Sequence, residues 1–244
     1  MDKYIGNELE IFEHARNWKS YYGSFIKPLL GKQVAEIGAG LGGTTTALCD
    51  GSQESWLCVE PDQQLTNEIE RKINEGVLPV ICKSFTGYSS DVEKQVDSIL
   101  YIDVIEHIED DKAELLHAAN LLKEGGHLFI IVPAHQTLYS PFDKMIGHYR
   151  RYSRQSLKEV VPASLQIQKL YYLDSAGYFA SLVNKLLLKQ SMPTLKQVKF
   201  WDRFIVPVSK ITDRILGFSF GKSVLLVAKK QELNRGFSTS YKNN

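Results

Sequence analysis

The sequence predicts an α/β fold in which a doubly wound parallel sheet carries helices on both faces. Short apolar runs alternate with longer amphipathic stretches, and strands that alternate with helices form right-handed βαβ units. The runs are rich in Ile, Val and Leu at consecutive positions, as strands covered on both sides require. Strands are expected at 33–37, 55–60, 78–82, 98–103 and 127–132. Helices are expected near 44–50, 62–73 and 110–123.

The two ends of the chain lie outside this alternation. Residues 1–30 are expected to form a helical lead-in, in which Trp18 and Tyr22 recur at helical spacing. This aromatic stripe either closes over a ligand as a lid or packs on the sheet, and we expect Trp18 to lie beside the ligand. The polar residues 231–244 are expected to form a flexible tail.

Residues 31–230 are expected to form one domain, in which residues 134–221 add a loop and helices before the last strand. The insert begins with polar and aromatic residues and continues with a strand at 165–173. Helices are expected near 176–189 and 200–216, and the last strand at 223–229. The second helix has a broad apolar face. Core packing is the leading interpretation of that face, and an acceptor pocket, a dimer contact and a membrane surface are the alternatives.

Composition excludes several classes of protein. The 244 residues carry a formal net charge of +1, which gives no basic footprint for nucleic acid. The three cysteines, an odd number without metal-type spacing, indicate a reducing cytoplasm and no disulfide framework. The N-terminus does not resemble a signal peptide, and no apolar run is long enough to span a membrane. Peripheral membrane contact stays open, as does the choice between monomer and homodimer.

A glycine-rich turn follows the first expected strand, in the run VAEIGAGLGGT at 34–44. Gly38 and Gly40 let the backbone turn sharply and approach a ligand closely, and the next helix presents free N–H groups. The same spacing suits a dinucleotide site. Glu36 favours a cationic ligand instead, because its carboxylate would repel a pyrophosphate. Glu60 ends the second strand and is placed to accept hydrogen bonds from two ribose hydroxyls in either kind of site.

Four motifs together resemble the class I S-adenosylmethionine-dependent methyltransferases. They are EIGAGLG at 36–42, the acid Glu60, DVIEHI at 103–108 and the glycine turn GGHL at 125–128. The resemblance covers roughly residues 30–135 and implies a seven-stranded, Rossmann-like methyltransferase fold. The run KSF at 83–85 stands where the family contacts adenine, but it lacks the family's usual Gly-Asp pair.

The resemblance implies S-adenosylmethionine as cofactor, S-adenosylhomocysteine as product, and no metal. The expected cofactor contacts are Trp18, Glu36, Gly38, Ala39, Gly40, Gly42, Glu60, Pro61, Ser84, Phe85, Asp103 and Val104. For Glu60 and Pro61 the alternative is a helix start. Asp103 is expected to face either the methionine ammonium or the acceptor. Outside the core, VPAH at 132–135, LYS at 138–140 and GHYRRYS at 147–153 resemble the signature of a bacterial subgroup.

The methyl acceptor is expected at the carboxyl ends of the fourth and fifth strands, where ligands bind in doubly wound sheets. The candidate catalytic residues are His107, His135, Tyr139, His148, Arg150 and Arg151. Histidine suits proton removal near neutral pH, and arginine suits an anionic acceptor. The alternatives are structural. His107 packs beneath the cofactor, and His135 is a solvated loop residue. The arginines then pair with Asp110, Asp111 or Asp143.

The predicted function is therefore S-adenosylmethionine-dependent O-methylation of a small-molecule or peptide acceptor. His148, Arg150 and Arg151 would hold an anionic group of that acceptor, such as a carboxylate. A nicotinamide or flavin oxidoreductase built on the same glycine turn is the alternative from another enzyme class. A non-catalytic subunit that binds S-adenosylmethionine is the alternative without turnover.

Overall fold

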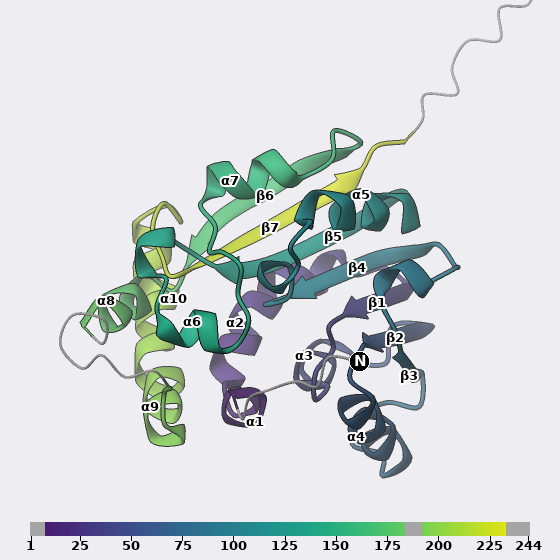
Figure 1. Ribbon diagram of the computed structural model, residues 1–244, viewed down its shortest axis with the longest axis horizontal. Helices are drawn as coiled ribbons and strands as arrows, with labels where there is room; N and C mark the ends of the chain where they lie inside the picture. The colour runs from purple at the N-terminus through teal and green to yellow at the C-terminus, as the bar shows by residue number, and fades with distance from the viewer. Residues whose placement is uncertain (1–7, 184–191, 233–244) are drawn as a thin grey trace, which may run out of the picture.

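A computed structural model describes residues 8–183 and 192–232 of the protein. Its centre is a seven-stranded sheet with the strand order β3-β2-β1-β4-β5-β7-β6 (Figure 1). The strands are β1 (Gln33–Ile37), β2 (Ser55–Glu60), β3 (Cys82–Thr86), β4 (Val96–Ile102), β5 (Leu122–Pro133), β6 (Leu165–Leu173) and β7 (Ser223–Lys230). β7 runs antiparallel to both of its neighbours, and the first five strands pair in parallel.

Helices cover both faces of the sheet, which confirms the predicted fold class. They are α1 (Glu8–Glu13), α2 (Arg16–Ile26), α3 (Gly43–Leu48), α4 (Gln63–Asn74), α5 (Asp111–Leu121), α6 (Pro141–Met145), α7 (Arg154–Val160), α8 (Ser175–Val183), α9 (Leu195–Phe200) and α10 (Val206–Ile215). A π-helical turn at Trp201–Ile205 joins α9 to α10. Side chains of α5 and α7 belong to the core on one face, and those of α2, α4, α9 and α10 belong to the core on the other.

The strand order places a switch point between β1 and β4. β1 pairs with β2 on one side and with β4 on the other, so the chain leaves the carboxyl ends of these strands in different directions. Ligands of doubly wound sheets bind in the crevice that this divergence creates. The glycine turn after β1 lies at this edge, together with Glu60 at the end of β2 and Asp103 after β4.

The third strand lies four residues later than predicted. The apolar run at 78–82 suggested a strand, but β3 is Cys82–Thr86 and has a half-exposed, partly polar sequence. β3 is an edge strand that pairs only with β2 in the sheet, so it needs fewer apolar residues than an interior strand. The predicted glycine turn at 125–128 also differs, because Gly125, at φ 76°, lies within β5.

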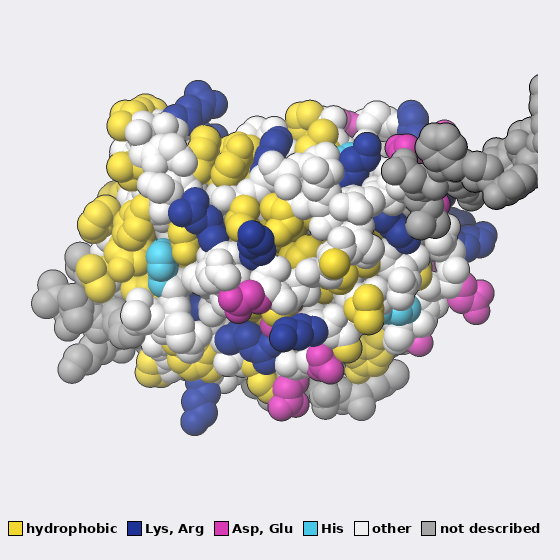
Figure 2. All heavy atoms as spheres, turned by 90° about the horizontal axis from the view of Figure 1, so that it is seen from above, with side chains coloured by type: hydrophobic (Ala, Val, Ile, Leu, Met, Phe, Trp, Pro, Cys, Tyr) yellow, Lys and Arg dark blue, Asp and Glu magenta, His cyan; other side chains and the backbone are white. Residues whose placement is uncertain are grey.

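The apolar face of the insert is not packed into the core, contrary to the leading interpretation. Five hydrophobic side chains between α9 and the end of α10 are 48–77% exposed: Phe200, Phe204, Val208, Ile211 and Ile215. Figure 2 shows hydrophobic side chains gathered towards the end of the molecule where Figure 1 places α8 and α10. The opposite side of the same segment is buried through Val206, Ser209 and Asp213. The helix predicted near 176–189 begins as α8, and its later residues lie outside the described part of the chain, as do 233–244 of the predicted tail.

No helix among the described residues is long and apolar enough to cross a membrane.

Candidate active site

The glycine turn after β1 packs directly against the chain that leaves β4. Gly38, Gly40 and Gly42 have φ values of 65°, 56° and 73°, a region that other residues rarely adopt. A Cβ atom added to Gly38 would lie 2.6 Å from Cγ2 of Val104. The backbone of this turn is therefore open to close approach by a ligand, and the turn leads into α3 through Gly42. Ala39 is buried within it and donates its N–H to the carbonyl of Val59.

Glu36 lies beneath this turn with its carboxylate bonded inside the protein. Its Oε2 accepts hydrogen bonds from Thr45 Oγ1 at 2.6 Å and from Trp56 Nε1 at 2.9 Å, and the residue is 2% exposed. Burial raises the pKa of Glu36 to about 7, although these hydrogen bonds oppose the shift. Glu36 thus supports the start of α3 through Thr45.

We expect Glu36→Gln to flatten the pH dependence of stability between about pH 4.5 and pH 7. In the folded protein the Glu36 carboxyl keeps its proton up to about pH 7, whereas the unfolded chain loses it near its ordinary pKa. The wild type should therefore lose stability as pH rises through this window, by about 2–3 kcal/mol for this group. Urea denaturation at pH 5 and pH 8 measures the change. Any pH-independent effect of the amide cancels in the comparison, and an unchanged wild-type–variant difference would contradict the prediction.

Glu60 holds the turn from the neighbouring strand. Its Oε2 accepts from the Gly40 N–H at 2.9 Å and its Oε1 from the Asp62 N–H at 3.1 Å. Burial raises the pKa of Glu60 despite these bonds. Pro61 is exposed beside it. Asp62 caps α4 by accepting from Gln64 N and Leu65 N, so both sequence-based interpretations of this segment apply: an acid at the crevice and a helix start.

Asp103 is exposed to solvent, although much of its surroundings is protein. It follows β4 at φ 55°, and its side chain is open to solvent. Burial nevertheless raises the pKa of Asp103 to about 6, and four cationic groups oppose the shift: His148, Lys222, Lys19 and Arg151. The carboxylate of Asp103 is thus accessible to solvent although protein atoms surround it. Asp103 is therefore the acid most available to a cationic ligand at this edge of the sheet.

The N-terminal helices lie over the glycine turn. A Cβ atom on Gly40 would be 3.4 Å from Leu9 of α1, and one on Gly43 would be 3.1 Å from Lys19 of α2. Lys19 Nζ donates to the carbonyls of Phe12 and Glu13 at 2.8 and 3.1 Å, which joins α1 to α2.

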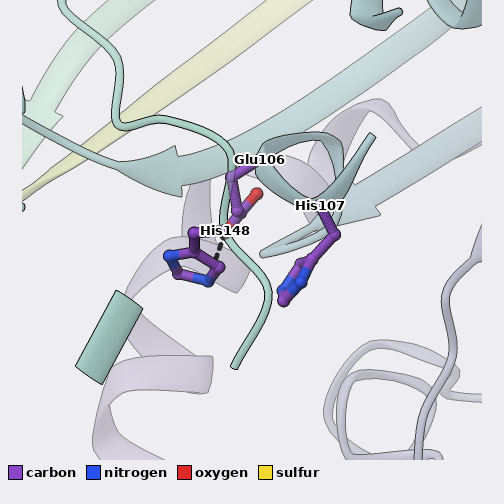
Figure 3. A group of neighbouring side chains, drawn as sticks. All are labelled: Glu106, His107 and His148. Carbon is purple, nitrogen blue, oxygen red and sulfur yellow. Dashed lines mark ion pairs between the residues drawn. The ribbon is translucent and has the colours of Figure 1, made fainter. Parts of the chain in front are cut away.

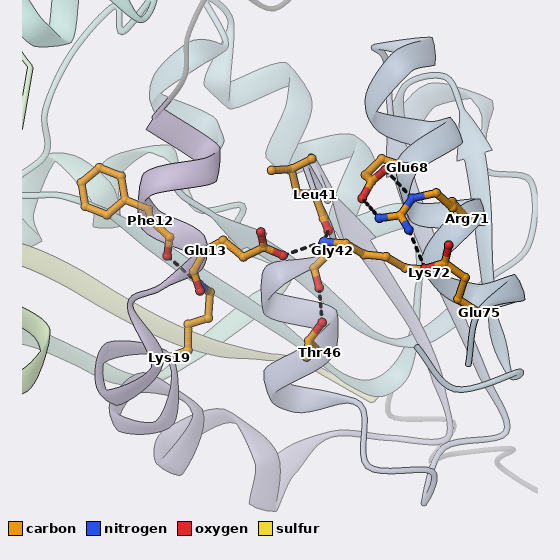
Figure 4. Close-up of polar contacts among 10 residues, drawn as sticks. All are labelled: Phe12, Glu13, Lys19, Leu41, Gly42, Thr46, Glu68, Arg71, Lys72 and Glu75. Atoms are coloured by element: carbon orange, nitrogen blue, oxygen red, sulfur yellow. Dashed lines mark hydrogen bonds and ion pairs between the residues drawn. The ribbon is translucent and has the colours of Figure 1, made fainter. Parts of the chain in front are cut away.

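Lys72 of α4 completes this attachment. Its Nζ lies 2.6 Å from Glu13 Oε1 and donates to the carbonyl of Leu41 at 2.8 Å, so one ammonium connects α1, α4 and the glycine turn (Figure 4). Trp18 of α2 packs within an aromatic cluster. It is 7% exposed and packs against Tyr22 and Trp201, with ring centroids 5.6 and 5.9 Å away, which favours the packing interpretation of this aromatic stripe.

The residues expected to contact adenine are displaced by the shift of β3. Ser84 and Phe85 lie within the strand and are partly exposed, whereas Thr86 and Gly87 form its exit. The Gly87 N–H donates to the Glu60 carbonyl at 3.1 Å, and a Cβ atom on Gly87 would lie 2.7 Å from the Phe85 ring. Gly87 is therefore the close-packed position at the end of β3. A glycine at this point of the sequence was the only local sign of that close approach.

Two of the candidate catalytic histidines lie side by side: His107 follows β4, and His148 lies between α6 and α7, after β5. His107 ends the 3-10 turn Ile105–His107, and its ring centroid lies 4.5 Å from that of His148. Burial and, to a smaller extent, the neighbouring His148 lower the pKa of His107 to about 4. Glu106, between them, is fully buried, and neither of its carboxylate oxygens has a hydrogen-bond partner. The pKa of Glu106 is raised well above its ordinary value, first by burial and then by the charge of Asp103.

A second carboxylate, Asp143, organises the loop after β5. It accepts from His148 Nδ1 at 2.9 Å, from Arg151 Nε and Nη2 at 2.7 and 3.0 Å, and from Ser140. Burial opposes the ionised form, but these hydrogen bonds hold the pKa of Asp143 well below its usual range. Tyr139 donates to the His148 carbonyl at 2.7 Å, which fixes the backbone of the same loop.

Both arginines make ion pairs within the protein. Arg151 is paired with Asp143, and Arg150 Nη1 lies 2.6 Å from Asp111 Oδ2. This is the structural arrangement that the sequence left open. His135 also has a structural role: its Nε2 lies 2.9 Å from the Gly221 carbonyl, and its ring stacks on Tyr172 at 4.9 Å. It is not a freely solvated histidine.

Sequence reasoning missed two lysines whose charges act on Asp103, Lys19 and Lys222. It named Asp143 as a possible partner of the arginines but did not predict that Asp143 orients His148. Lys222 comes from the segment just before β7, and Lys19 from the helix treated as aromatic packing. Glu106 was visible within the DVIEHI motif, where an acid beside a histidine was the available signal. No local pattern marks the two lysines, because β7 and α2 approach Asp103 only through the tertiary fold.

Comparison with known proteins finds methyltransferases among those similar to this chain. Residues 35–128 match the family model described as a methyltransferase domain. A curated relative, the mitochondrial ubiquinone biosynthesis O-methyltransferase of Dictyostelium discoideum, is 27% identical over 142 residues. That match covers 52% of this chain and 42% of the relative, so the chain spans less than half the length of that protein.

Two solved structures share the fold at low sequence identity. The complex of the Haloferax volcanii Trm112 methyltransferase activator with the putative methyltransferase has a TM-score of 0.61 at 14% identity, covering 94% of this chain and 97% of the other. Coclaurine N-methyltransferase bound to N-methylheliamine and SAH, the cofactor product, also has a TM-score of 0.61 at 14% identity, covering 88% and 72%. Residues 35–128 thus match a methyltransferase domain, and the chain shares the Rossmann-like fold of these solved structures.

Proposed function

We propose that the protein transfers the methyl group of S-adenosylmethionine to an oxygen atom of a small-molecule or peptide acceptor. The observation that carries the proposal is the meeting of the glycine turn, Glu60 and the exposed carboxylate of Asp103 at the carboxyl ends of three adjacent strands. The O-methyltransferase named among its relatives supports oxygen as the acceptor atom. The cofactor supplies an activated methyl group on a positively charged sulfur.

The residues of this edge fit such a cofactor. The backbone of Gly38 and Gly40 is open to a ligand. A Cβ atom at Gly38 would collide with Val104, and the positive φ of both residues disfavours any side chain. Glu60 has carboxylate lone pairs left for ribose hydroxyls after accepting from two N–H groups. Asp103 offers a negative charge to the cationic amino-acid end. These groups favour a sulfonium nucleoside over a pyrophosphate.

The acceptor side is proposed at His107 and His148, beyond Asp103. Lys19 and Lys222 both lie close enough to Asp103 to favour its ionised form. Arg150 and Arg151 are poorly placed to hold an anionic acceptor group, because both guanidinium groups already pair with aspartates of the protein. Methyl transfer needs in-line orientation of the acceptor and exclusion of water, which the covering helices α1 and α2 would provide.

Glu60→Gln is expected to weaken binding of S-adenosylhomocysteine by about 10- to 100-fold, since a hydrogen bond to a charged group contributes about 1.5–3 kcal/mol. Glu68→Gln is the matched control, because Glu68 is an acid on the exposed side of α4 that pairs with Arg71. Isothermal titration calorimetry of the purified protein measures both variants.

Thermal shift assays with S-adenosylhomocysteine, NAD and FAD distinguish the competing functions. Stabilisation by NAD or FAD and not by S-adenosylhomocysteine would favour an oxidoreductase. Binding of S-adenosylhomocysteine without methyl transfer to any phenol, carboxylate or peptide in an acceptor panel would favour a non-catalytic subunit.

A further inference from the structure

The carboxylate of Glu106 occupies an unusual environment beside the proposed cofactor site. It is fully buried, and both of its oxygens lack a hydrogen-bond partner among the residues that the structure describes. A buried carboxylate without a partner is costly, and native proteins satisfy such groups with hydrogen bonds, charges or metals. Figure 3 shows the Glu106 side chain pointing towards His148, with the His107 ring directed into the same space.

The two histidines present ring nitrogens to this carboxylate. The ligand atoms of Glu106, His107 and His148 all lie within 4.8 Å of one another. Two atoms that each lie about 2.1 Å from one ion are separated by about 3.0–3.6 Å when adjacent and about 4.2 Å when opposite. The 3.8 Å between His148 Nε2 and Glu106 Oε1 is too long for a hydrogen bond and slightly longer than the spacing of two adjacent ligands of one ion. Small side-chain movements would close the remaining distances.

Asp143 orients His148 in the way that metal sites use. It lies 2.9 Å from His148 Nδ1, so this nitrogen carries the hydrogen and Nε2 is left to face Glu106. Histidine ligands of metals commonly donate their other ring N–H to a carboxylate, which fixes the ring. Nε2 of His148 thus faces the buried carboxyl of Glu106, whose two oxygens have no hydrogen-bond partner among the described residues.

We propose that Glu106, His107 and His148 bind a divalent transition-metal ion, with Zn²⁺ as the representative probe. Two imidazoles and one carboxylate form a ligand set used by zinc and iron sites, and three protein ligands leave coordination positions open. The resemblance to methyltransferases implied no metal, and this inference departs from that expectation.

The ion would lie next to the place proposed for the acceptor. Glu106 is three residues after Asp103, and the charges of Asp103 and His148 act on each other. An open coordination position there suits an acceptor oxygen, whose hydroxyl proton a bound cation makes easier to lose. This role rests on the proposed function, whereas metal binding itself does not.

Metal binding is tested on the full chain after removal of metals with a chelator. Calorimetric titration with Zn²⁺, and absorption spectroscopy with Co²⁺, should each show one ion bound per chain. Glu106→Gln and His107→Gln should weaken binding at least tenfold and abolish the Co²⁺ spectrum. His127→Gln is the matched control, because His127 is a partly buried histidine on β5 away from the cluster. Its binding should match that of the wild type.

Folding and function are separated by two further measurements. Glu106→Gln removes a charge without a partner, so its metal-free melting temperature should not fall, and this variant decides the test if His107→Gln folds poorly. Wild-type protein that takes up neither ion, or variants that bind as tightly as the wild type, would overturn the metal site. Binding of S-adenosylhomocysteine in the presence of chelator tests the proposed function independently, so each proposal can fail alone.

The acceptor role has its own readout. 4-Nitrocatechol changes its visible absorption when its oxygens coordinate a metal. We expect this change with the wild type and with His127→Gln in the presence of Zn²⁺, and not with Glu106→Gln under the same conditions or with metal-free protein. An unchanged spectrum with the loaded wild type would remove the acceptor role and leave the metal site in place.

Discussion

Gly38→Ala is expected to weaken binding of S-adenosylhomocysteine by at least tenfold and to destabilise the protein. The new methyl group would lie 2.6 Å from Cγ2 and 3.1 Å from Cγ1 of Val104, and the residue would keep a φ of 65° that alanine disfavours. The turn must shift to relieve the contact. A shift of the turn changes the backbone surface offered to the cofactor. Calorimetry for affinity and urea denaturation for stability measure the two effects.

Two control variants separate the causes of this effect. Gly76→Ala imposes a similar φ of 71° at a site where nothing lies within 4 Å, so it should cost only the backbone term of about 1–2 kcal/mol and leave affinity unchanged. Adding Val104→Ala to Gly38→Ala removes the colliding side chain and should recover part of the lost affinity. Equal affinities for Gly38→Ala and the wild type would show that the cofactor does not depend on this turn.

Asp213→Ala should cause the largest loss of stability, about 3–5 kcal/mol. Asp213 is fully buried in α10 and accepts three hydrogen bonds, from Tyr21 Oη at 2.8 Å and from the N–H groups of Asp174 and Ser175 at 2.7 and 2.8 Å. Truncation leaves three buried donors without an acceptor and removes one of the contacts between α2 and the insert. The melting temperature and the urea midpoint should both fall.

Two further variants test this interpretation. Asp50→Ala is the control, since Asp50 is an exposed aspartate that accepts from Ser52 N, and its loss should cost less than about 1 kcal/mol. Tyr21→Phe removes one of the three donors and should cost about 1 kcal/mol in the wild type but close to nothing in Asp213→Ala. Additive losses in the double variant would mean that Tyr21 and Asp213 stabilise the protein independently.

The apolar face of residues 200–216 is exposed, whereas the sequence favoured its burial in the core. Asp213 joins α10 to the end of β6 through the N–H groups of Asp174 and Ser175 and to α2 through Tyr21, so the apolar residues on the other side of α10 are not needed for attachment. The periodicity of 200–216 correctly indicated a helical segment with an apolar face, as the π-helical turn and α10 show. It could not indicate which face turns inward, because a buried aspartate with three donors is invisible in a hydrophobic pattern.

The sequence alone determined the parts of the protein that depend on local chemistry. Strands 33–37, 55–60 and 165–173 were predicted with the bounds that β1, β2 and β6 have, and the glycine turn was placed correctly, because buried strands require apolar runs and positive φ requires glycine. The tertiary structure decided the rest. The edge position of β3, the pairing of Arg150 and Arg151, and the convergence of Glu106 with His148 depend on which segments the sheet brings together. Such contacts join residues far apart in the chain, and no local pattern records them.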